Sequence, residues 1–169
     1  MLTIRDYQSS DADAINALAV KAFSQYSKDF HNWTAFSERA QQFSSLSNEA
    51  EIIVATINDE AALNEEIVAA VAYVGAAVVK PSHFPANTPI IRMLVTSPDH
   101  RGLGLGKKLT QQCIDRAIKD KCDEIALHTS PIMTVALSMY LRMGFERIAA
   151  APDIEGVKYG VYVKKGLHR

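Results

Sequence analysis

The sequence has few of the features that mark specialised protein classes. It holds only two cysteines, Cys113 and Cys122, and their nine-residue separation places them on roughly opposite sides of any helix that contains both. A disulfide-stabilised domain is therefore not indicated, and two free thiols fit a reducing compartment. The first residues, MLTIRDYQSS, lack the basic segment followed by an apolar one that secretory signals carry. We therefore expect a cytoplasmic protein.

Neither sign of charge is in excess. The chain has 18 Lys and Arg residues against 19 Asp and Glu residues, which gives a formal net charge of −1. Such a balance provides no general attraction to nucleic acid or to an anionic membrane. The longest apolar run, Ile67 to Val79, is too short for a membrane-spanning helix and suits a buried strand. We expect no nucleic-acid or membrane partner, and instead a small molecule or another protein.

The 169 residues, 48% of them hydrophobic, fit a single domain over residues 1–169 with its own apolar core. Apolar periodicity predicts strands at 2–7, 52–57, 67–79, 90–96, 124–129, 145–149 and 157–164. It predicts helices at 9–23, at 33–46, from Leu105 onward and at 131–143. Ser10 is the expected N-cap of the first helix, and the last has Ser130 as N-cap, Pro131 at N1 and Gly144 at C′. This order indicates a mixed α/β (α+β) protein.

Three glycines occupy five positions in HRGLGLGKKL, residues 100–109, between a predicted strand and a predicted helix. Glycine permits positive φ and the close approach of a ligand, and backbone N–H groups at a helix N-terminus bind anions. The stretch therefore predicts a phosphate site, with a close-packed turn as the alternative. Spacing excludes a P-loop, because Arg101 stands where its first glycine is needed. It also disfavours a dinucleotide fingerprint, because Lys107 stands where the third glycine is needed.

Two segments resemble the GNAT superfamily of N-acetyltransferases. Residues 92–106, RMLVTSPDHRGLGLG, resemble its acyl-CoA-binding motif, whose core Arg/Gln-x-x-Gly-x-Gly/Ala reads here as Arg-Gly-Leu-Gly-Leu-Gly. Residues 136–146, ALSMYLRMGFE, resemble its Ala-x-x-x-Tyr-x-x-x-Gly-Phe segment, with Ala136, Tyr140, Gly144 and Phe145 in register. The two motifs stand in the order of the family, with a predicted strand between them.

The resemblance implies a mostly antiparallel sheet of about seven strands flanked by about four helices. Strands 90–96 and 124–129 would splay apart to form an acetyl-CoA cleft, with the glycines clearing room for the pyrophosphate. Main-chain groups would bind acetyl-CoA, the pantetheine arm through Leu94 and Val95, and the pyrophosphate through Arg101, Gly102, Leu103, Gly104, Leu105, Gly106 and Lys107. No metal is implied.

The implied activity is transfer of the acetyl group from acetyl-CoA to a primary amine of a small molecule or peptide by direct attack. Tyr140 matches the family's general acid, a phenol that protonates the departing thiolate, and core packing is its alternative role. A CoA-binding sensor or interaction module on the same fold is the rival function, and a nucleotide-binding domain is a further one. A monomer and a homodimer both fit the sequence.

The sequence assigns no base to deprotonate the amine. His83 and His128 are candidates because imidazole titrates near neutrality, with an ordinary loop or sheet-end histidine as the alternative for each. Arg92 lies where many relatives carry a glutamate, which favours either an anionic substrate group or a structural ion pair. Met133 stands where the family often has an asparagine, so that role is not carried over. An acceptor pocket or plain core packing accounts for the aromatic residues Tyr26, Phe30, Trp33 and Phe36.

Overall fold

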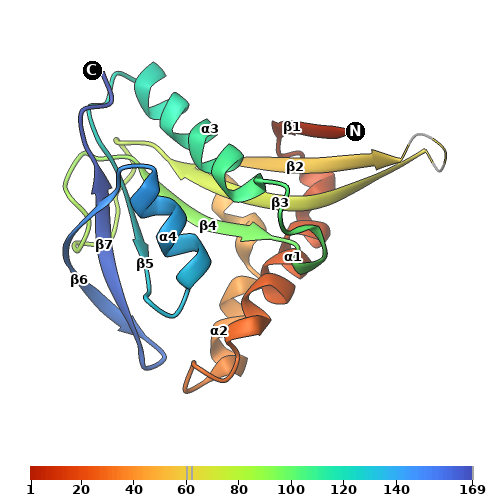
Figure 1. The fold of residues 1–169 in the computed structure, drawn as a ribbon, viewed down its shortest axis with the longest axis horizontal. Coiled ribbons are helices and arrows are strands. Elements are labelled where there is room, and N and C mark those ends of the chain that lie inside the picture. The colour runs from red at the N-terminus through yellow and green to blue at the C-terminus, as the bar shows by residue number, and fades with distance from the viewer. Residues whose placement is uncertain (60, 62, 169) are drawn as a thin grey trace.

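The computed structural model describes residues 1–59, 61 and 63–168, which form one seven-stranded sheet with helices on both faces (Figure 1). The strands are β1 Leu2–Asp6, β2 Glu51–Asp59, β3 Asn64–Val74, β4 Ile90–Thr96, β5 Ile125–Thr129, β6 Glu146–Ile154 and β7 Val157–Lys164. The α-helices are α1 Ala12–Phe23, α2 Trp33–Ala40, α3 Leu105–Lys119 and α4 Thr134–Arg142. The strand order is β1-β2-β3-β4-β5-β7-β6, and all pairs except β4–β5 are antiparallel. The expected mixed, mostly antiparallel architecture is confirmed.

Alternating side chains place different helices on the two faces of the sheet. Val71 and Tyr73 of β3 belong to the buried cluster that includes the apolar face of α3. Ala70 and Ala72, their neighbours on the same strand, pack instead with the apolar face of α1. Because successive side chains of a strand point to opposite faces, α3 and α1 cover opposite sides of β3. The aromatic residues of α2 form a third cluster with β5 and β7.

Strands β4 and β5 separate directly after they meet. Ile90 and Ala126 are their one registered pair in the described chain, next to a hydrogen bond of 3.0 Å from the Ala126 N–H to the Pro89 carbonyl. β4 also carries a bulge, because its register against β3 shifts between Val95 and Arg92. Met93 lies in this bulge with a φ of 56°, a strained value for a residue with a side chain. The predicted splayed strand pair is therefore present, and we call it the β4–β5 fork.

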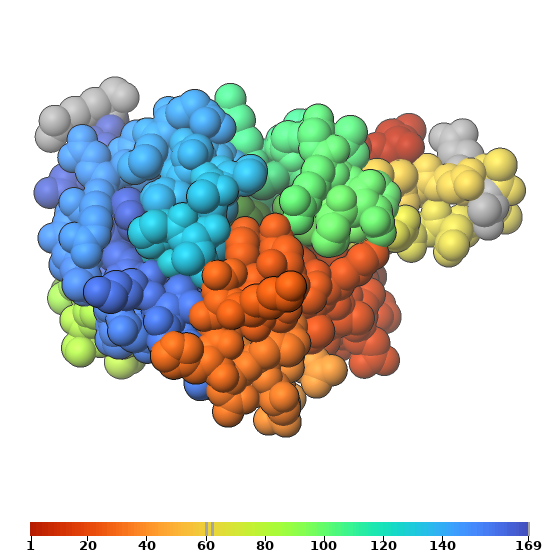
Figure 2. Space-filling model, turned by 60° about the horizontal axis from the view of Figure 1, so that its bottom comes forward, coloured from red at the N-terminus to blue at the C-terminus, as the bar shows by residue number. Residues whose placement is uncertain are grey.

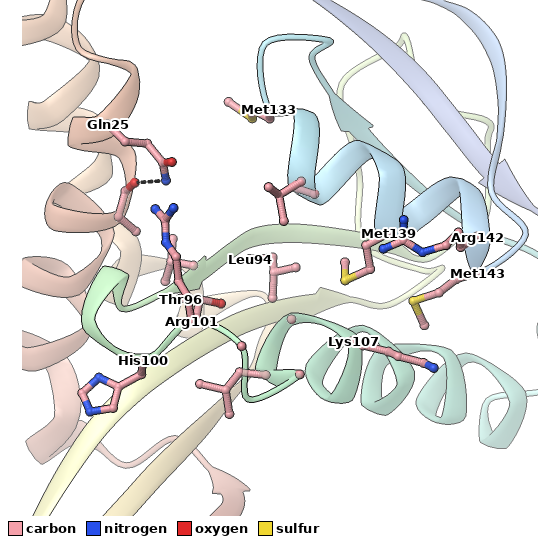
Figure 3. Close-up of a pocket in the computed structure, with 18 of the residues that line it drawn as sticks. Gln25, Leu94, Thr96, His100, Arg101, Lys107, Met133, Met139, Arg142 and Met143 are labelled. Carbon is pink, nitrogen blue, oxygen red and sulfur yellow. Dashed lines mark hydrogen bonds between the residues drawn. The ribbon is translucent and has the colours of Figure 1, made fainter.

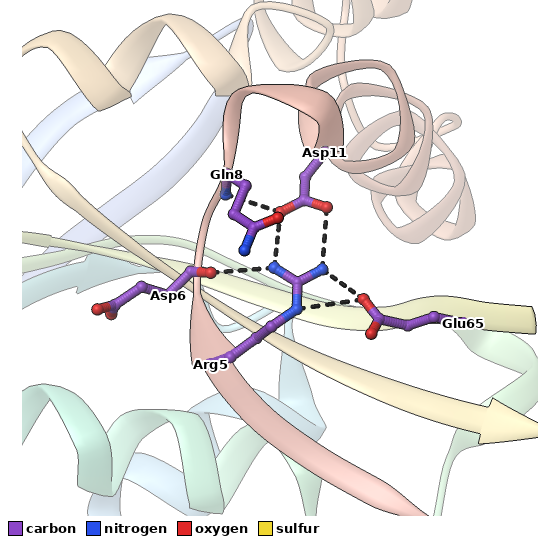
Figure 4. A network of polar contacts seen from close by, with 5 residues as sticks. All are labelled: Arg5, Asp6, Gln8, Asp11 and Glu65. Atoms are coloured by element: carbon purple, nitrogen blue, oxygen red, sulfur yellow. Dashed lines mark hydrogen bonds and ion pairs between the residues drawn. The ribbon is translucent and has the colours of Figure 1, made fainter.

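A network of charges fastens β1 to the start of α1 (Figure 4). The Arg5 guanidinium donates two hydrogen bonds, of 2.8 and 3.0 Å, to the carboxylate of Asp11. It donates to Glu65 of β3 through Nε at 3.1 Å and to the Asp6 carbonyl at 3.0 Å. The Gln8 N–H donates to Asp11 at 2.8 Å. These bonds fix the direction in which α1 leaves the sheet and so position its far end beside β4.

Several predicted boundaries differ from the structure. A 3-10 turn over Ser9–Asp11 precedes α1, so Asp11 and not Ser10 holds the N-cap position. The third strand, predicted over 67–79, begins earlier and ends at Val74. Beyond that end the Lys80 ammonium donates to three carbonyl oxygens, those of Gly75, Ala76 and Val78, which folds the segment into a turn. The second helix stops at Ala40 and is followed by a 3-10 segment over Phe43–Asn48.

The start of the last helix was also predicted wrongly. Ser130 and Pro131 form a turn in which the Met133 N–H donates to the Ser130 carbonyl at 2.9 Å, and α4 begins only at Thr134. The predicted end is confirmed. Gly144 follows α4 with a φ of 96°, and the Phe145 N–H closes the helix by donating to the Tyr140 carbonyl at 3.0 Å.

Two further observations concern the chain as a whole. Cys113 and Cys122 are both free thiols, as expected. Across residues 1–59, 61 and 63–168, no helix has the length and apolar character needed to cross a membrane.

Candidate functional site

A cavity of about 740 Å³ opens at the β4–β5 fork. Figure 2 shows the face where the α1–α2 segment in orange, the glycine stretch in green and α4 in blue meet. The cavity walls come from the end of α1, the end of β4, the start of α3 and one side of α4. They comprise Ala22, Phe23, Gln25, Tyr26, Leu94, Val95, Thr96, His100, Arg101, Gly102, Gly104, Leu105, Gly106, Lys107, Gln111, Met133, Val135, Ala136, Met139, Arg142, Met143 and Lys164.

The backbone at the start of α3 forms one end of this cavity. Gly102 has a φ of 83°, and Gly104, the N-cap of α3, has a φ of 70°. A Cβ at either position would meet no protein atom within 4 Å. Positive φ, and not crowding by the protein, therefore requires glycine at both positions. The space beside them is open to a ligand.

The N–H groups of this stretch have no internal acceptor. Within the described chain, no hydrogen bond joins the backbone N–H of any residue from 101 to 107 to another protein group. The first intrahelical bond is that of the Lys108 N–H to the Gly104 carbonyl, at 3.0 Å. Unpaired N–H groups beside the positive end of a 15-residue helix make this end of the cavity suited to an anion.

Gly106 has a different role from the other two glycines. It lies inside α3, where a Cβ would contact the Met139 sulfur at 3.4 Å and the Leu94 side chain at 3.7 Å. These neighbours belong to α4 and β4, so Gly106 lets three elements approach one another at the floor of the cavity. Figure 3 shows Leu94 between Gln25, in the 3-10 turn that follows α1, and Met139 on α4.

The charged side chains of the lining are all basic. Arg101, Lys107, Arg142 and Lys164 line the cavity, and no aspartate or glutamate among the described residues does. Lys164 donates to the Met143 carbonyl at 2.7 Å, which holds it against the end of α4. None of the four has a carboxylate within 4.0 Å in the part of the chain that the structure describes. Unneutralised cations and unpaired N–H groups together fit a ligand with several phosphates, as CoA has.

Most of the predicted cofactor residues come together here. Leu94, Val95, Arg101, Gly102, Gly104, Leu105, Gly106 and Lys107 all line the cavity. Leu103 does not, and its side chain is 47% exposed. Sequence reasoning missed Gln25, His100, Arg142 and Lys164. His100 and Arg142 lie within the two motif segments but at none of their defining positions, and all four reach the cavity through the fold. Of the four aromatic candidates, Tyr26 lines the cavity, while Phe30, Trp33 and Phe36 pack together in an apolar cluster.

Tyr140 lies behind the cavity wall. It is 5% exposed, packs edge to face on Phe145 and belongs to the buried cluster beneath α3, while its neighbours Ala136, Met139 and Met143 line the cavity. Burial, with a smaller contribution from Cys113, raises the pKa of the Tyr140 phenol well above its usual value. Burial also raises the pKa of the Cys113 thiol, to about 12. This core therefore disfavours phenolate and thiolate alike.

The two candidate bases, His83 and His128, lie together on the face of the fork that α2 covers, opposite α3. The rings of His83 and His128 stack with centroids 5.6 Å apart. Burial, with smaller contributions from the charges of His83 and Arg92, lowers the pKa of His128 to about 4. Burial and the Arg92 charge also lower the pKa of His83. Both imidazoles are therefore neutral at pH 7, and neither is among the cavity-lining residues.

No group of three or more His, Cys, Asp or Glu residues suited to a metal ion occurs among residues 1–59, 61 and 63–168. Met133, which stands at the family's asparagine position, lines the cavity with a largely buried thioether and precedes α4 as its N-cap.

Comparisons with known proteins agree on one family. The chain shares 41% identity over 58 residues with N-alpha-acetyltransferase 30 of Saccharomyces cerevisiae, a match that covers 34% of this chain and 33% of that protein. The chain thus spans about a third of the length of that curated relative.

Solved structures match along almost the whole chain. The PaiA N-acetyltransferase from Thermoplasma acidophilum, determined in complex with coenzyme A, superposes with a TM-score of 0.73 at 16% identity and covers 98% of this chain and 99% of its own. The NatC complex bound to Gag peptide and CoA gives a TM-score of 0.65 at 19% identity, over 97% and 98%. At these identities the likeness establishes a shared fold. The family model for the "Acetyltransferase (GNAT) family" matches residues 13–145, and the chain therefore belongs to that family.

Proposed function

We propose that the protein is an acetyl-CoA-dependent N-acetyltransferase, which moves an acetyl group to a primary amine of a small molecule or peptide. Residues 1–169 act as one domain in this proposal. Leu94 and Val95 bind the pantetheine arm through their main chain, and residues 101–107 bind the pyrophosphate. The name of the yeast relative and the Gag peptide in the NatC structure support a peptide amine as one acceptor class to test.

One observation carries the proposal: within the described part of the chain, a row of unpaired backbone N–H groups shares a cavity with four cations and no carboxylate. A polyphosphate satisfies those groups, whereas an apolar or cationic ligand leaves them without partners. The cavity continues along β4, where the bulge shifts the register against β3 next to Leu94. An extended ligand arm that pairs with this strand edge would reach from the glycine stretch to the fork.

Acetyl-CoA supplies an activated thioester, and the remaining chemistry belongs to the chain. The uncharged amine attacks the carbonyl carbon, the C–S bond breaks, and the Tyr140 hydroxyl gives its proton to the departing sulfur. The amine loses one proton to solvent, and the Tyr140 phenolate regains one from solvent, which restores the phenol. A raised pKa keeps the phenol protonated.

The position of Tyr140 also favours a second candidate, a CoA-binding sensor or interaction module. Tyr140 does not line the cavity, and the described lining residues include no carboxylate that could deprotonate an amine. A protein that only binds CoA needs neither group. Binding and turnover must therefore be measured separately.

The test follows CoA release from acetyl-CoA by chromatography, because the half-buried Cys122 would react with thiol reagents. Acceptors are monoamines, polyamines, amino acids and peptides, and variants are Tyr140→Phe and the matched Tyr162→Phe, which alters another buried tyrosine of the same cluster. We expect kcat to fall at least tenfold in Tyr140→Phe and to stay within twofold in Tyr162→Phe. Turnover unaffected by Tyr140→Phe would remove the general-acid role. CoA binding without turnover of any amine would favour the sensor.

A further inference from the structure

Arg92 and His128 lie opposite each other at the point where the β4–β5 fork opens. Ile90 and Ala126, the registered pair, belong to the apolar cluster on the face that α2 covers. Arg92 and His128 each follow two residues later on their strands, so their side chains point to that same face. They lie at the same fork as the cavity but outside its lining.

The imidazole of His128 belongs to a cluster of rings, and one ring nitrogen of this cluster lacks a hydrogen-bond partner in the described chain. His83 stacks on it, and Phe84 and Tyr159 pack against it with centroids 5.4 and 5.1 Å away. The His83 Nε2 is buried and has no hydrogen-bond partner among the residues that the structure describes. Buried nitrogens are almost always paired with a protein group, water or a ligand, so this atom marks a place where a polar partner fits.

Arg92 provides a positive charge that no protein carboxylate neutralises. Over residues 1–59, 61 and 63–168, the half-buried Arg92 makes no ion pair within 4.0 Å and no side-chain hydrogen bond. Burial first, and the Arg92 charge to a smaller degree, lower the pKa of both His83 and His128, in agreement with the place of Arg92 opposite His128 at the fork. Glu155, in the β6–β7 turn next to the aromatic cluster, is paired with Arg39 at 3.4 Å. A partly desolvated guanidinium without an anion is unfavourable unless a ligand supplies one.

We propose that Arg92, with His128 and His83, binds a carboxylate of the acceptor, so that the protein acetylates amines that also carry a carboxylate group. This inference rests on the proposed acetyltransferase function. The guanidinium pairs with a carboxylate through two parallel hydrogen bonds, and a neutral imidazole adds an N–H donor. Anchored there, the acceptor presents its amine to the fork from the face opposite α3. The carboxylate belongs either to an amino acid or to an acidic first residue of a peptide.

The experiment compares carboxylates with their uncharged amides. One arm pairs glycine with glycinamide, and the other pairs peptides that begin with Asp or with Asn, all at matched concentrations of uncharged amine. In one arm, we expect the wild-type kcat/KM to be at least tenfold higher for the carboxylate than for its amide. That arm shows whether the carboxylate belongs to an amino acid or to the first residue of a peptide. Acetylation of amides and carboxylates at equal rates would leave the proposed function standing and overturn this inference.

Variants link the preference to Arg92. In Arg92→Gln, kcat/KM for the preferred carboxylate falls at least tenfold, mainly through KM, while the amide changes less than twofold. Arg92→Lys keeps the positive charge but lacks the planar, two-donor geometry of the guanidinium, and we expect it to recover part of the lost kcat/KM. Arg147→Gln, at an exposed arginine of β6, is the matched control and keeps the preference. Equal losses for amide and carboxylate in Arg92→Gln would contradict a carboxylate site.

A binding measurement tests the carboxylate site even if no amine is acetylated. N-acetylglycine and N-acetyl-aspartyl-alaninamide are titrated into the CoA-loaded protein, with N-acetylglycinamide and N-acetyl-asparaginyl-alaninamide as controls, while NMR follows the imidazole signals. One of the two carboxylates should shift the His128 signals with a Kd at least tenfold below that of its amide, and the Kd should rise tenfold in Arg92→Gln. Equal binding of acid and amide, or binding of neither acid, would show that the site is absent.

Discussion

Positive charge is neutralised in one region of the molecule and left without a partner in another. At the corner between β1 and α1, Arg5 bonds to the carboxylates of Asp11 and Glu65 and to the Asp6 carbonyl. At the β4–β5 fork, Arg92 and Arg101 have no carboxylate within 4.0 Å in the described residues. The first arrangement joins two elements of the fold. The second keeps charge available for ligands that bring their own anions.

The two regions also differ in how the backbone is used. At the corner, the Gln8 N–H is paired internally with the Asp11 carboxylate. At the fork, the N–H groups of residues 101–107 have no acceptor within the described chain. A region whose donors are all paired contributes to stability, and one with unpaired donors gains that contribution only when a ligand binds. Mutations in the two regions should therefore change different measured quantities.

The largest effect on stability is expected at the corner. Asp11→Asn should lower the free energy of unfolding by about 2 kcal/mol, because it removes the charge from a nearly buried carboxylate bonded to Arg5. Urea unfolding of the purified protein measures this change. Asp13→Asn, at an exposed position on the same helix, is the control and should change stability by less than about 0.5 kcal/mol.

The effect of Asp11 has a defined pH dependence. Its bonds to Arg5 hold the pKa of the folded Asp11 carboxyl below its usual value. The ionised carboxylate therefore stabilises the fold above the usual carboxyl pKa, and the contribution is lost as pH falls through the lower folded pKa. The difference between wild type and Asp11→Asn should be constant near neutrality and shrink in acid. A difference that persists unchanged in strong acid would show that packing, and not charge, is responsible.

The next effect is on ligand binding at the glycine stretch. Gly104→Val should raise the Kd for CoA about tenfold, because a β-branched residue at a φ of 70° is strained and the loop must move its N–H groups. Isothermal titration calorimetry measures it. Gly75→Ala is the control, since a Cβ there meets nothing within 4 Å and φ is not positive. Unchanged CoA affinity in Gly104→Val would mean that the stretch is only a turn.

The elements on one side of the fork were predictable because they are local. The glycines, β4 and the start of α3 lie in one continuous segment, and the predicted bounds of β4 match the structure. The separation of β4 from β5 was expected only from the resemblance to the family. The predicted end of α4 is also confirmed, because the backbone there has a positive φ that favours glycine at position 144.

The features that the sequence did not predict depend on contacts between residues far apart in the chain. The third strand ends where the Lys80 ammonium reaches back to three carbonyls, and no local signal marks that bond. Ser130-Pro131 has the composition of a helix start, yet Ser130 closes a turn first. Arg142 and Lys164 reach the cavity from α4 and β7, so their role emerges only when the sheet is assembled. The burial of Tyr140 behind Met139 likewise follows from helix packing that its motif does not specify.

A smaller effect on binding is expected from single cations of the cavity. Lys107→Gln or Arg142→Gln should raise the Kd for CoA about threefold at low salt, since one partly solvated ion pair contributes little. The difference should decrease at high salt because mobile ions screen the interaction. Lys119→Gln, at the exposed end of α3, should leave the Kd unchanged. If removal of one cation raised the Kd for CoA tenfold, that side chain, and not the backbone N–H groups, would be the main contributor to CoA binding.

The smallest effect on stability is expected at Arg92. Arg92→Gln should change the free energy of unfolding by less than about 0.5 kcal/mol, or raise it slightly, because the half-buried guanidinium has no ion pair to lose. Arg5→Gln, measured beside it by the same urea titration, should cost about 2 kcal/mol, because it removes the donor of the Asp11 bonds. If Arg92→Gln destabilised the protein as strongly as Arg5→Gln, Arg92 would have a structural partner, and the contrast between a paired corner and an unpaired fork would fail.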